Sequence, residues 1–152
     1  MLKTLRFFAP VFMLVLCACS SSQKAELDYS LAAINSAVES QLTMGIQRKS
    51  ENGRTFFSRP FVVKQENESD GNIVRQRGRA KVEVSGDRRP YTIDVSVDIE
   101  GAQVVGKEQP SDSDYSRIRS DNGLAKKLLS NISATLERRG QYKNFIDDFR
   151  PF

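Results

Sequence analysis

The sequence predicts an α+β domain in which two helices cover one face of an antiparallel sheet of three to four strands. Residues 28–44 and 122–139 space their apolar side chains at helical intervals, so each forms a helix with one apolar side. Residues 74–84 and 91–99 alternate polar or charged side chains with uncharged, mostly apolar ones, which is typical of half-buried strands. These faces can leave water only by packing together, which gives two layers in the order α-β-β-β-α.

The first helix is expected from about Asp28 to Met44. Asp28 is placed to act as its N-cap, and Gly45 stands where a C-cap glycine belongs. The apolar stripe, which recurs every three or four residues, consists of Leu27, Leu31, Ile34, Val38 and Leu42. This stripe is expected to face the sheet.

Residues 55–65 predict the first strand, but Pro60 cannot donate a ladder hydrogen bond, so the strand lies at an edge or breaks there. The strands 74–84 and 91–99 flank a turn containing Gly86-Asp87 and form an antiparallel hairpin. Gly78 and Ala80 leave a shallow trough on its core face, where a helix can approach closely. Residues 107–120 are expected to form a polar loop.

The second helix is expected over 122–139, with Asp121 as its cap and Gly140 at its end. Its apolar side consists of Leu124, Leu128, Leu129, Ile132 and Leu136. Residues 141–152 form an amphipathic aromatic tail with Tyr142, Phe145, Phe149 and Phe152. The tail is expected to dock on the domain's own core; a partner protein or a membrane surface is the alternative.

The first 18 residues have the layout of a cleaved secretory signal. Lys3 and Arg6 make a positive start, and the apolar run 7–16 is too short to span a bilayer as a helix. Small residues follow before Cys19. The signal takes two of the 23 Lys and Arg residues and none of the 19 Asp and Glu residues, so its removal lowers the net charge from +4 to +2.

Leu16-Cys17-Ala18-Cys19 resembles the lipobox of bacterial lipoproteins, with a leucine three residues before the cysteine and Ser-Ser-Ser after it. The resemblance implies cleavage before Cys19 and a diacylglyceryl and N-acyl lipid on that residue. Ser20 resembles the outer-membrane sorting pattern, so a periplasm-facing outer-membrane protein is expected; the inner membrane and the cell surface stay open. The alternatives are a released protein or lipid on Cys17, but Leu16 puts a bulky residue before Cys17.

The remaining chain divides into a lipidated tether at 19–27, the domain at 28–140 and the tail at 141–152. Nine residues of tether reach at most about 30 Å, which keeps the domain close to the membrane. Three acyl chains hold far more firmly than one, at about 0.8 kcal/mol per buried methylene. A surface-anchored domain is therefore expected.

The residue types exclude much chemistry. The chain has no histidine, and its two cysteines are the one lost with the signal and the one that carries lipid. Disulfides, thiolate or Ser-His-Asp catalysis and the usual zinc sites need those residues. A domain that is not an enzyme, with no metal and no cofactor beyond the covalent lipid, is expected.

The mature pattern resembles the small helix–three-strand–helix domains of BamC-type outer-membrane lipoproteins. The stripe 31–42, the hairpin 74–99 and the stripe 124–136 carry this resemblance. It implies a non-catalytic accessory role in the assembly of envelope proteins, and it transfers no functional residue. The lipopolysaccharide-assembly lipoprotein LptE has a similar element order, but it begins with a strand for which this sequence gives no signal.

A basic row on the outer face of the first hairpin strand is the sharpest candidate site. Arg75, Arg77, Arg79 and Lys81 span about 20 Å, and Arg88 and Arg89 follow in the turn. The row has the charge to bind lipopolysaccharide phosphates or phospholipid headgroups. Nucleic acid is not expected, because the chain is exported and aromatic residues are missing among the arginines.

The neighbouring strand supplies acids that would neutralise the row. One register pairs Lys81 with Asp94, Arg77 with Asp98 and Arg75 with Glu100; the other pairs Arg79 with Asp94 and Arg75 with Asp98. Each cross-strand pair contributes about 0.2–1 kcal/mol and cancels part of the field. Structural ion pairs are the favoured interpretation.

Two further groups of carboxylates are expected to be solvated. Asp94 and Asp98 lie about 13 Å apart along a strand, whereas glycosidase pairs need about 5–9.5 Å. Residues 112–116 begin like a calcium loop, but Arg117 and Gly123 stand where glycine and glutamate belong. Neither group predicts a catalytic or metal site.

The sequence therefore predicts a lipid-anchored envelope protein that binds another envelope protein without catalysis. A carrier of lipid or lipopolysaccharide is the alternative, and it requires a cavity at the trough of Gly78 and Ala80. No other small-molecule ligand is expected. The partner is not identified by the sequence.

Overall fold

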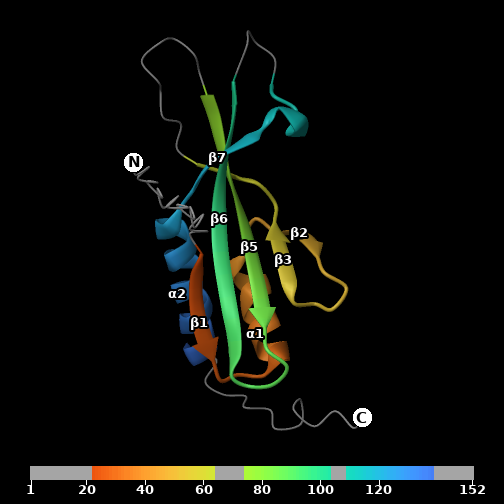
Figure 1. Ribbon diagram of the computed structural model, residues 1–152, viewed down its shortest axis with the longest axis vertical. Coiled ribbons are helices and arrows are strands. Elements are labelled where there is room, and N and C mark those ends of the chain that lie inside the picture. The colour runs from red at the N-terminus through yellow and green to blue at the C-terminus, as the bar shows by residue number, and fades with distance from the viewer. Residues whose placement is uncertain (1–21, 64–73, 104–108, 139–152) are drawn as a thin grey trace, which may run out of the picture.

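The computed structural model describes residues 22–63, 74–103 and 109–138, and it confirms a two-layer α+β fold with a largely antiparallel sheet and two helices (Figure 1). In chain order the elements are β1 (Gln23–Leu27), α1 (Leu31–Gln41), β2 (Ile46–Lys49), β3 (Thr55–Ser58), β4 (Phe61–Val62), β5 (Val74–Ser85), β6 (Tyr91–Gln103), the 3-10 helix η1 (Asp112–Asp114), β7 (Ser116–Ser120) and α2 (Asn122–Arg138).

The sheet has seven described strands, so the expectation of three to four was too low. The main path runs β1-β6-β5-β3-β2, while β4 pairs with β5 and β7 pairs with β6. The expected hairpin is the long central pair β5 and β6, and α1 and α2 lie together behind it (Figure 1). The additional strands attach on either side of this pair.

Strand β1 corrects the expected tether at 19–27. Residues 23–27 pair with β6, from Gln23 opposite Val95 to Leu27 opposite Tyr91. Leu27 is buried, so it anchors β1 in the core and does not belong to the helix stripe. The folded domain therefore includes residues 23–27, which were expected to be tether. The sequence pattern did not predict β1, because residues 23–27 are mostly polar and bury only one large side chain, Leu27.

Helix α1 is shorter at both ends than expected. Its N-cap is the buried Ser30, whose Oγ accepts a hydrogen bond from the Ala33 amide at 3.2 Å, so Asp28 is not the cap. The helix ends at Gln41, with Leu42 as its C-cap. Gly45 has φ +87° but lies beyond the helix, at the entry to β2. Serine and aspartate are both good N-caps. Because β1 ends only at Leu27, the helix begins at Leu31 and Ser30 is in the N-cap position.

The core lies between the helices and the inner sheet face. Its largest fully buried side chains come from α1, α2, β3, β5 and β6, and each contributes about 1.5–3 kcal/mol through burial. They are Phe56, Ile34, Ile93, Ile99, Ile132, Val38, Val82, Val84, Val95 and Val97. The period of two therefore marked the buried face of the hairpin correctly.

The predicted strand 55–65 breaks at Pro60, as expected, into β3 and β4. Phe61 lies opposite Gly78, and its ring fills the space above that glycine. A β-carbon at position 78 would lie 2.3 Å from the Phe61 ring. The expected close approach at Gly78 therefore belongs to an aromatic ring, not to a helix.

Two further strands, β2 and β7, were missed because their side chains are mostly exposed. Residues 107–120 were expected to be a loop, but they include η1 and β7. Strand β2 is the outer strand on the main path; it pairs with β3 through a bulge between Ile46 and Arg48. Such strands are held by backbone pairing and give no alternating apolar signal.

Helix α2 begins and ends within one residue of the expected 122–139. Asp121 Oδ1 accepts the Leu124 amide hydrogen bond at 2.9 Å, which confirms the expected cap. Gly140 and the aromatic tail lie outside the described residues.

Gly78→Ala is expected to destabilise the domain, because the added methyl group must displace the Phe61 ring. We expect a loss of about 1–3 kcal/mol in the free energy of unfolding, measured by urea denaturation. The matched variant Gly78→Ala/Phe61→Leu should recover part of that loss. An unchanged or higher stability of Gly78→Ala would contradict the packing described here, since alanine is otherwise preferred to glycine in a strand.

Candidate functional site

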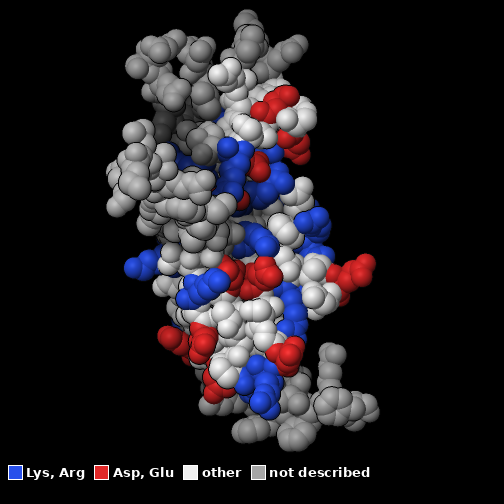
Figure 2. All heavy atoms as spheres, viewed as in Figure 1, with Lys and Arg blue, Asp and Glu red and all other residues white. Residues whose placement is uncertain are grey.

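The basic row lies on the outer face of β5, where Figure 2 shows acidic and basic side chains interleaved. Neither expected register is present: Arg77 lies opposite Glu100, Arg79 opposite Asp98 and Lys81 opposite Ser96. The hairpin closes at Ser85 and Thr92, which leaves Pro90 outside the ladder. Proline has no amide hydrogen to donate, so this register avoids an unfilled position in the ladder.

Three of the four residues in the row are nevertheless charge-compensated, as the sequence indicated, while Arg75 lies opposite Ala102. Arg77 Nε lies 2.7 Å from Glu100 Oε2, and Arg79 Nε lies 3.4 Å from the other oxygen of that carboxylate. Lys81 pairs along its own strand with Glu83 at 2.7 Å. The outer face of β5 is thus an ion-pair network and not an open anion-binding track.

Arg77 is the centre of this network. Its side chain is 12% exposed, its guanidinium also bonds Asp112 in η1, and its Cζ lies 3.8 Å from the centre of the Tyr115 ring. Partial burial lowers the pKa of Arg77, but the hydrogen bonds and charges of Asp112 and Glu100 outweigh burial and raise it. Arg77 therefore fastens η1 to the sheet.

Residues 112–116 have a structural role in place of the calcium-like one considered above. The hydrogen bond and positive charge of Arg77 lower the pKa of Asp112. Hydrogen bonds from the side chain and backbone of Ser111 lower the pKa of Asp114. These carboxylates already have partners. In the described ranges no three His, Cys, Asp or Glu side chains are grouped to hold a metal ion.

A polar hollow of about 250 Å³ lies on the outer face over β5 and β6, next to β7 and to Ser22, the residue before β1. Its charged side chains include Arg117, which lies 3.0 Å from Asp98, and Lys81, which lies 2.7 Å from Glu83. Asp94 lies 3.4 Å from Lys24 of β1. The hollow is lined by Ser22, Lys81, Glu83, Asp94, Ser96, Asp98, Arg117 and Ser120.

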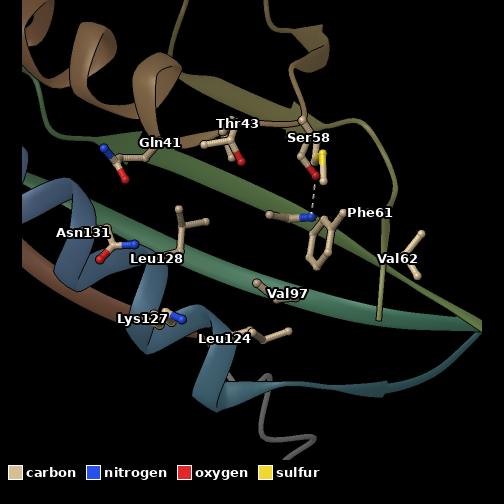
Figure 3. A pocket seen from close by; sticks show the side chains of 13 residues that line it. Gln41, Thr43, Ser58, Phe61, Val62, Val97, Leu124, Lys127, Leu128 and Asn131 are labelled. Carbon is tan, nitrogen blue, oxygen red and sulfur yellow. Dashed lines mark hydrogen bonds between the residues drawn. The ribbon is translucent and has the colours of Figure 1, made fainter. Parts of the chain in front are cut away.

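An apolar cleft of about 280 Å³ opens on the other face, between the end of α1, helix α2 and β4 (Figure 3). Its floor is formed by Ala80 and Val97 of the sheet, and Leu124 and Leu128 of α2 form one wall. Phe61 closes the side next to Gly78. The cleft therefore lies at the trough where the sequence placed a cavity for the carrier alternative.

The rim of the cleft combines exposed apolar and polar groups. Met44 is 58% exposed and Val62 is 88% exposed, and both line the cleft. Ser58 Oγ accepts a hydrogen bond from the Ala80 amide at 2.9 Å (Figure 3). The Gln41 side chain donates a hydrogen bond to Thr135 at 2.9 Å. Lys127 and Asn131 supply further polar groups. An apolar floor with a polar rim is typical of a binding site.

Sequence reasoning missed the two rim residues. Phe61, Val62 and Val63 form an apolar run directly after Pro60, and a short edge strand cannot bury three successive side chains, because they alternate between its two faces. That run was a signal for an exposed apolar residue. The remaining candidates, Cys19 and the tail residues Tyr142, Phe145, Phe149 and Phe152, lie outside the described residues.

In comparisons with known proteins, the chain matches no family model and no curated protein sequence. No helix in the described part of the chain is long and apolar enough to cross a membrane.

Asp112→Asn is expected to remove stability that is present at neutral pH. Because the folded-state pKa of Asp112 is lowered, its contribution is present above its ordinary value of 3.8 and is lost as the pH falls through the folded-state pKa. The difference in unfolding free energy between wild type and variant should be constant from pH 7 to pH 5 and then narrow below about pH 4. Urea denaturation across this range checks it; a difference independent of pH would contradict the ion pair.

Proposed function

We propose that this chain is a bacterial envelope lipoprotein, anchored in the outer membrane by lipid on Cys19, whose domain binds another envelope protein without catalysing a reaction. The lipobox Leu16-Cys17-Ala18-Cys19 supports the anchor. The lack of histidine and the consumption of both cysteines support recognition in place of catalysis. The proposal includes no metal, no nucleic acid and no cofactor beyond the covalent lipid.

The apolar cleft is the observation that carries the binding role. Single exposed apolar residues are common, but Met44 and Val62 both line one concave site with a floor of Ala80 and Val97. A partner's apolar or aromatic side chain can enter such a cleft and leave water there. The polar rim can then fix the partner's orientation through hydrogen bonds.

The size of the cleft favours a protein side chain over a whole lipid. Its volume of about 280 Å³ lies just below the roughly 300–1,000 Å³ of pockets that enclose a small-molecule ligand. The outer face of the sheet carries paired charges, so it offers little attraction to anions. Both features support the assembly or scaffolding role implied by the resemblance to BamC-type domains.

A carrier of lipid or lipopolysaccharide is the second candidate. The position of the cleft at Ala80 favours it, and so does β1, the leading strand whose expected absence separated this chain from LptE. Native mass spectrometry of the purified lipoprotein distinguishes the two candidates. Non-covalent lipid retained by wild type and lost in Ala80→Phe would support the carrier, whereas lipid-free protein supports the binding module.

Cys19→Ser is expected to abolish anchoring, because the lipid supplies most of the membrane affinity at about 0.8 kcal/mol per buried methylene. The wild-type protein should fractionate with membranes, and its intact mass should show the lipid. The variant should appear in the soluble periplasmic fraction or remain unprocessed. Equal membrane retention of wild type and variant, with no lipid in the wild-type mass, would contradict the anchor.

Val62→Asp is expected to weaken capture of the envelope partner without unfolding the domain, since Val62 is 88% exposed. An unpaired carboxylate in an apolar contact should lower recovery of the crosslinked partner at least about tenfold. Gln47→Asp adds the same charge to exposed β2 and serves as the matched control. Equal recovery with both variants in cells with intact membranes would exclude the cleft as the binding site.

A further inference from the structure

The start of β1 fixes which part of the domain can reach the membrane. Ser22 lines the polar hollow together with Arg117 and Ser120 of β7. It follows Cys19 by only three residues, which span at most about 11 Å. If Cys19 carries lipid, as the proposed function requires, Ser22 must lie within that distance of the bilayer surface, and β7, which lines the same hollow, must lie near it.

The side chains at this edge suit a membrane interface. All of the first four residues of β7 are exposed, and Ile118, at 51%, is one of three exposed large apolar residues among those that the structure describes. The other two, Met44 and Val62, belong to the cleft. Arg117 and Arg119 flank Ile118 in the sequence. Lys24 of the neighbouring β1 has a side chain that is 65% exposed.

We propose that the β1–β7 edge lies on the phospholipid surface of the membrane that holds Cys19. Ile118 enters the boundary between headgroups and acyl chains. The guanidinium groups of Arg117 and Arg119, which flank it in the sequence, lie at the level of the lipid phosphates and can donate hydrogen bonds to them. Arg117 keeps its bond to Asp98 at 3.0 Å and has further N–H groups to donate to a phosphate.

This orientation holds the β4 side of the cleft away from the bilayer. Val62 lies on β4, which is separated from β7 by β6 and β5, or about 14 Å at three strand spacings. Strand β2 lies four spacings from β1, or about 19 Å. The lipid therefore holds one edge of the sheet down while the apolar cleft stays accessible to a protein in the periplasm.

An introduced cysteine can be labelled selectively, because the only two cysteines of the sequence are Cys17 in the signal and the proposed lipid site Cys19. Single variants Ile118→Cys and Ser116→Cys place a thiol on β7. Gln47→Cys on β2 and Asp87→Cys in the β5–β6 turn serve as matched exposed controls. Each full-length lipoprotein is purified, labelled with a thiol-reactive fluorophore and reconstituted into vesicles of phosphatidylethanolamine, phosphatidylglycerol and brominated phosphatidylcholine.

We expect bromine quenching of the labels at 118 and 116 to exceed clearly the quenching at 47 and 87. In the Ser116→Cys protein, the added change Ile118→Ser should reduce quenching. Intact mass separates the two proposals: a protein without lipid refutes the anchor itself. A lipidated protein whose labels on β7 are quenched no more than those at 47 and 87 overturns the orientation alone.

Discussion

Antiparallel pairing of β5 with β6 is the interaction on which the rest of the molecule depends. The two strands pair without a break from Val74 opposite Gln103 to Ser85 opposite Thr92. Strands β1 and β7 attach to β6, and β3 and β4 attach to β5. The inner face of the pair supplies much of the core, while the outer face holds the ion pairs of Arg77 and Arg79. The polar hollow and the apolar cleft consequently both include residues of this hairpin.

The sequence predicted the elements that bury a whole face and missed those that do not. Alternation along β5 and β6 and the apolar side of α2 are direct consequences of burial, so their patterns located them closely. Strands β1, β2 and β7 are held by backbone hydrogen bonds and expose most of their side chains. The choice of Ser30 over Asp28 as a cap likewise depended on where β1 ends.

The candidate sites were predictable only where one strand carries them. The alternation of residues along β5 and β6 predicted the basic row and the acidic residues beside it. Predicting which residues lie opposite one another also required knowing that Pro90 stays in the turn, outside the ladder. The cleft draws on α1, β3, β4, β5, β6 and α2, which no local pattern links. Of its features, the sequence located the floor at Ala80, but the apolar run 61–63 did not specify that Phe61 would close one side while Val62 stayed exposed.

Strand β2 has a consequence for contacts between copies of this chain. Its outer side pairs with none of the described strands, and an open strand edge can template aggregation between neighbouring molecules. The bulge after Ile46 interrupts that edge. Arg48 and Lys49 cover the rings of Phe57 and Phe56, at 4.2 and 5.0 Å, and bring like charges to the same edge. Two copies that met at this edge would therefore bring Arg48 of one towards Arg48 of the other, while Lys49 is paired with Glu39 at 2.8 Å.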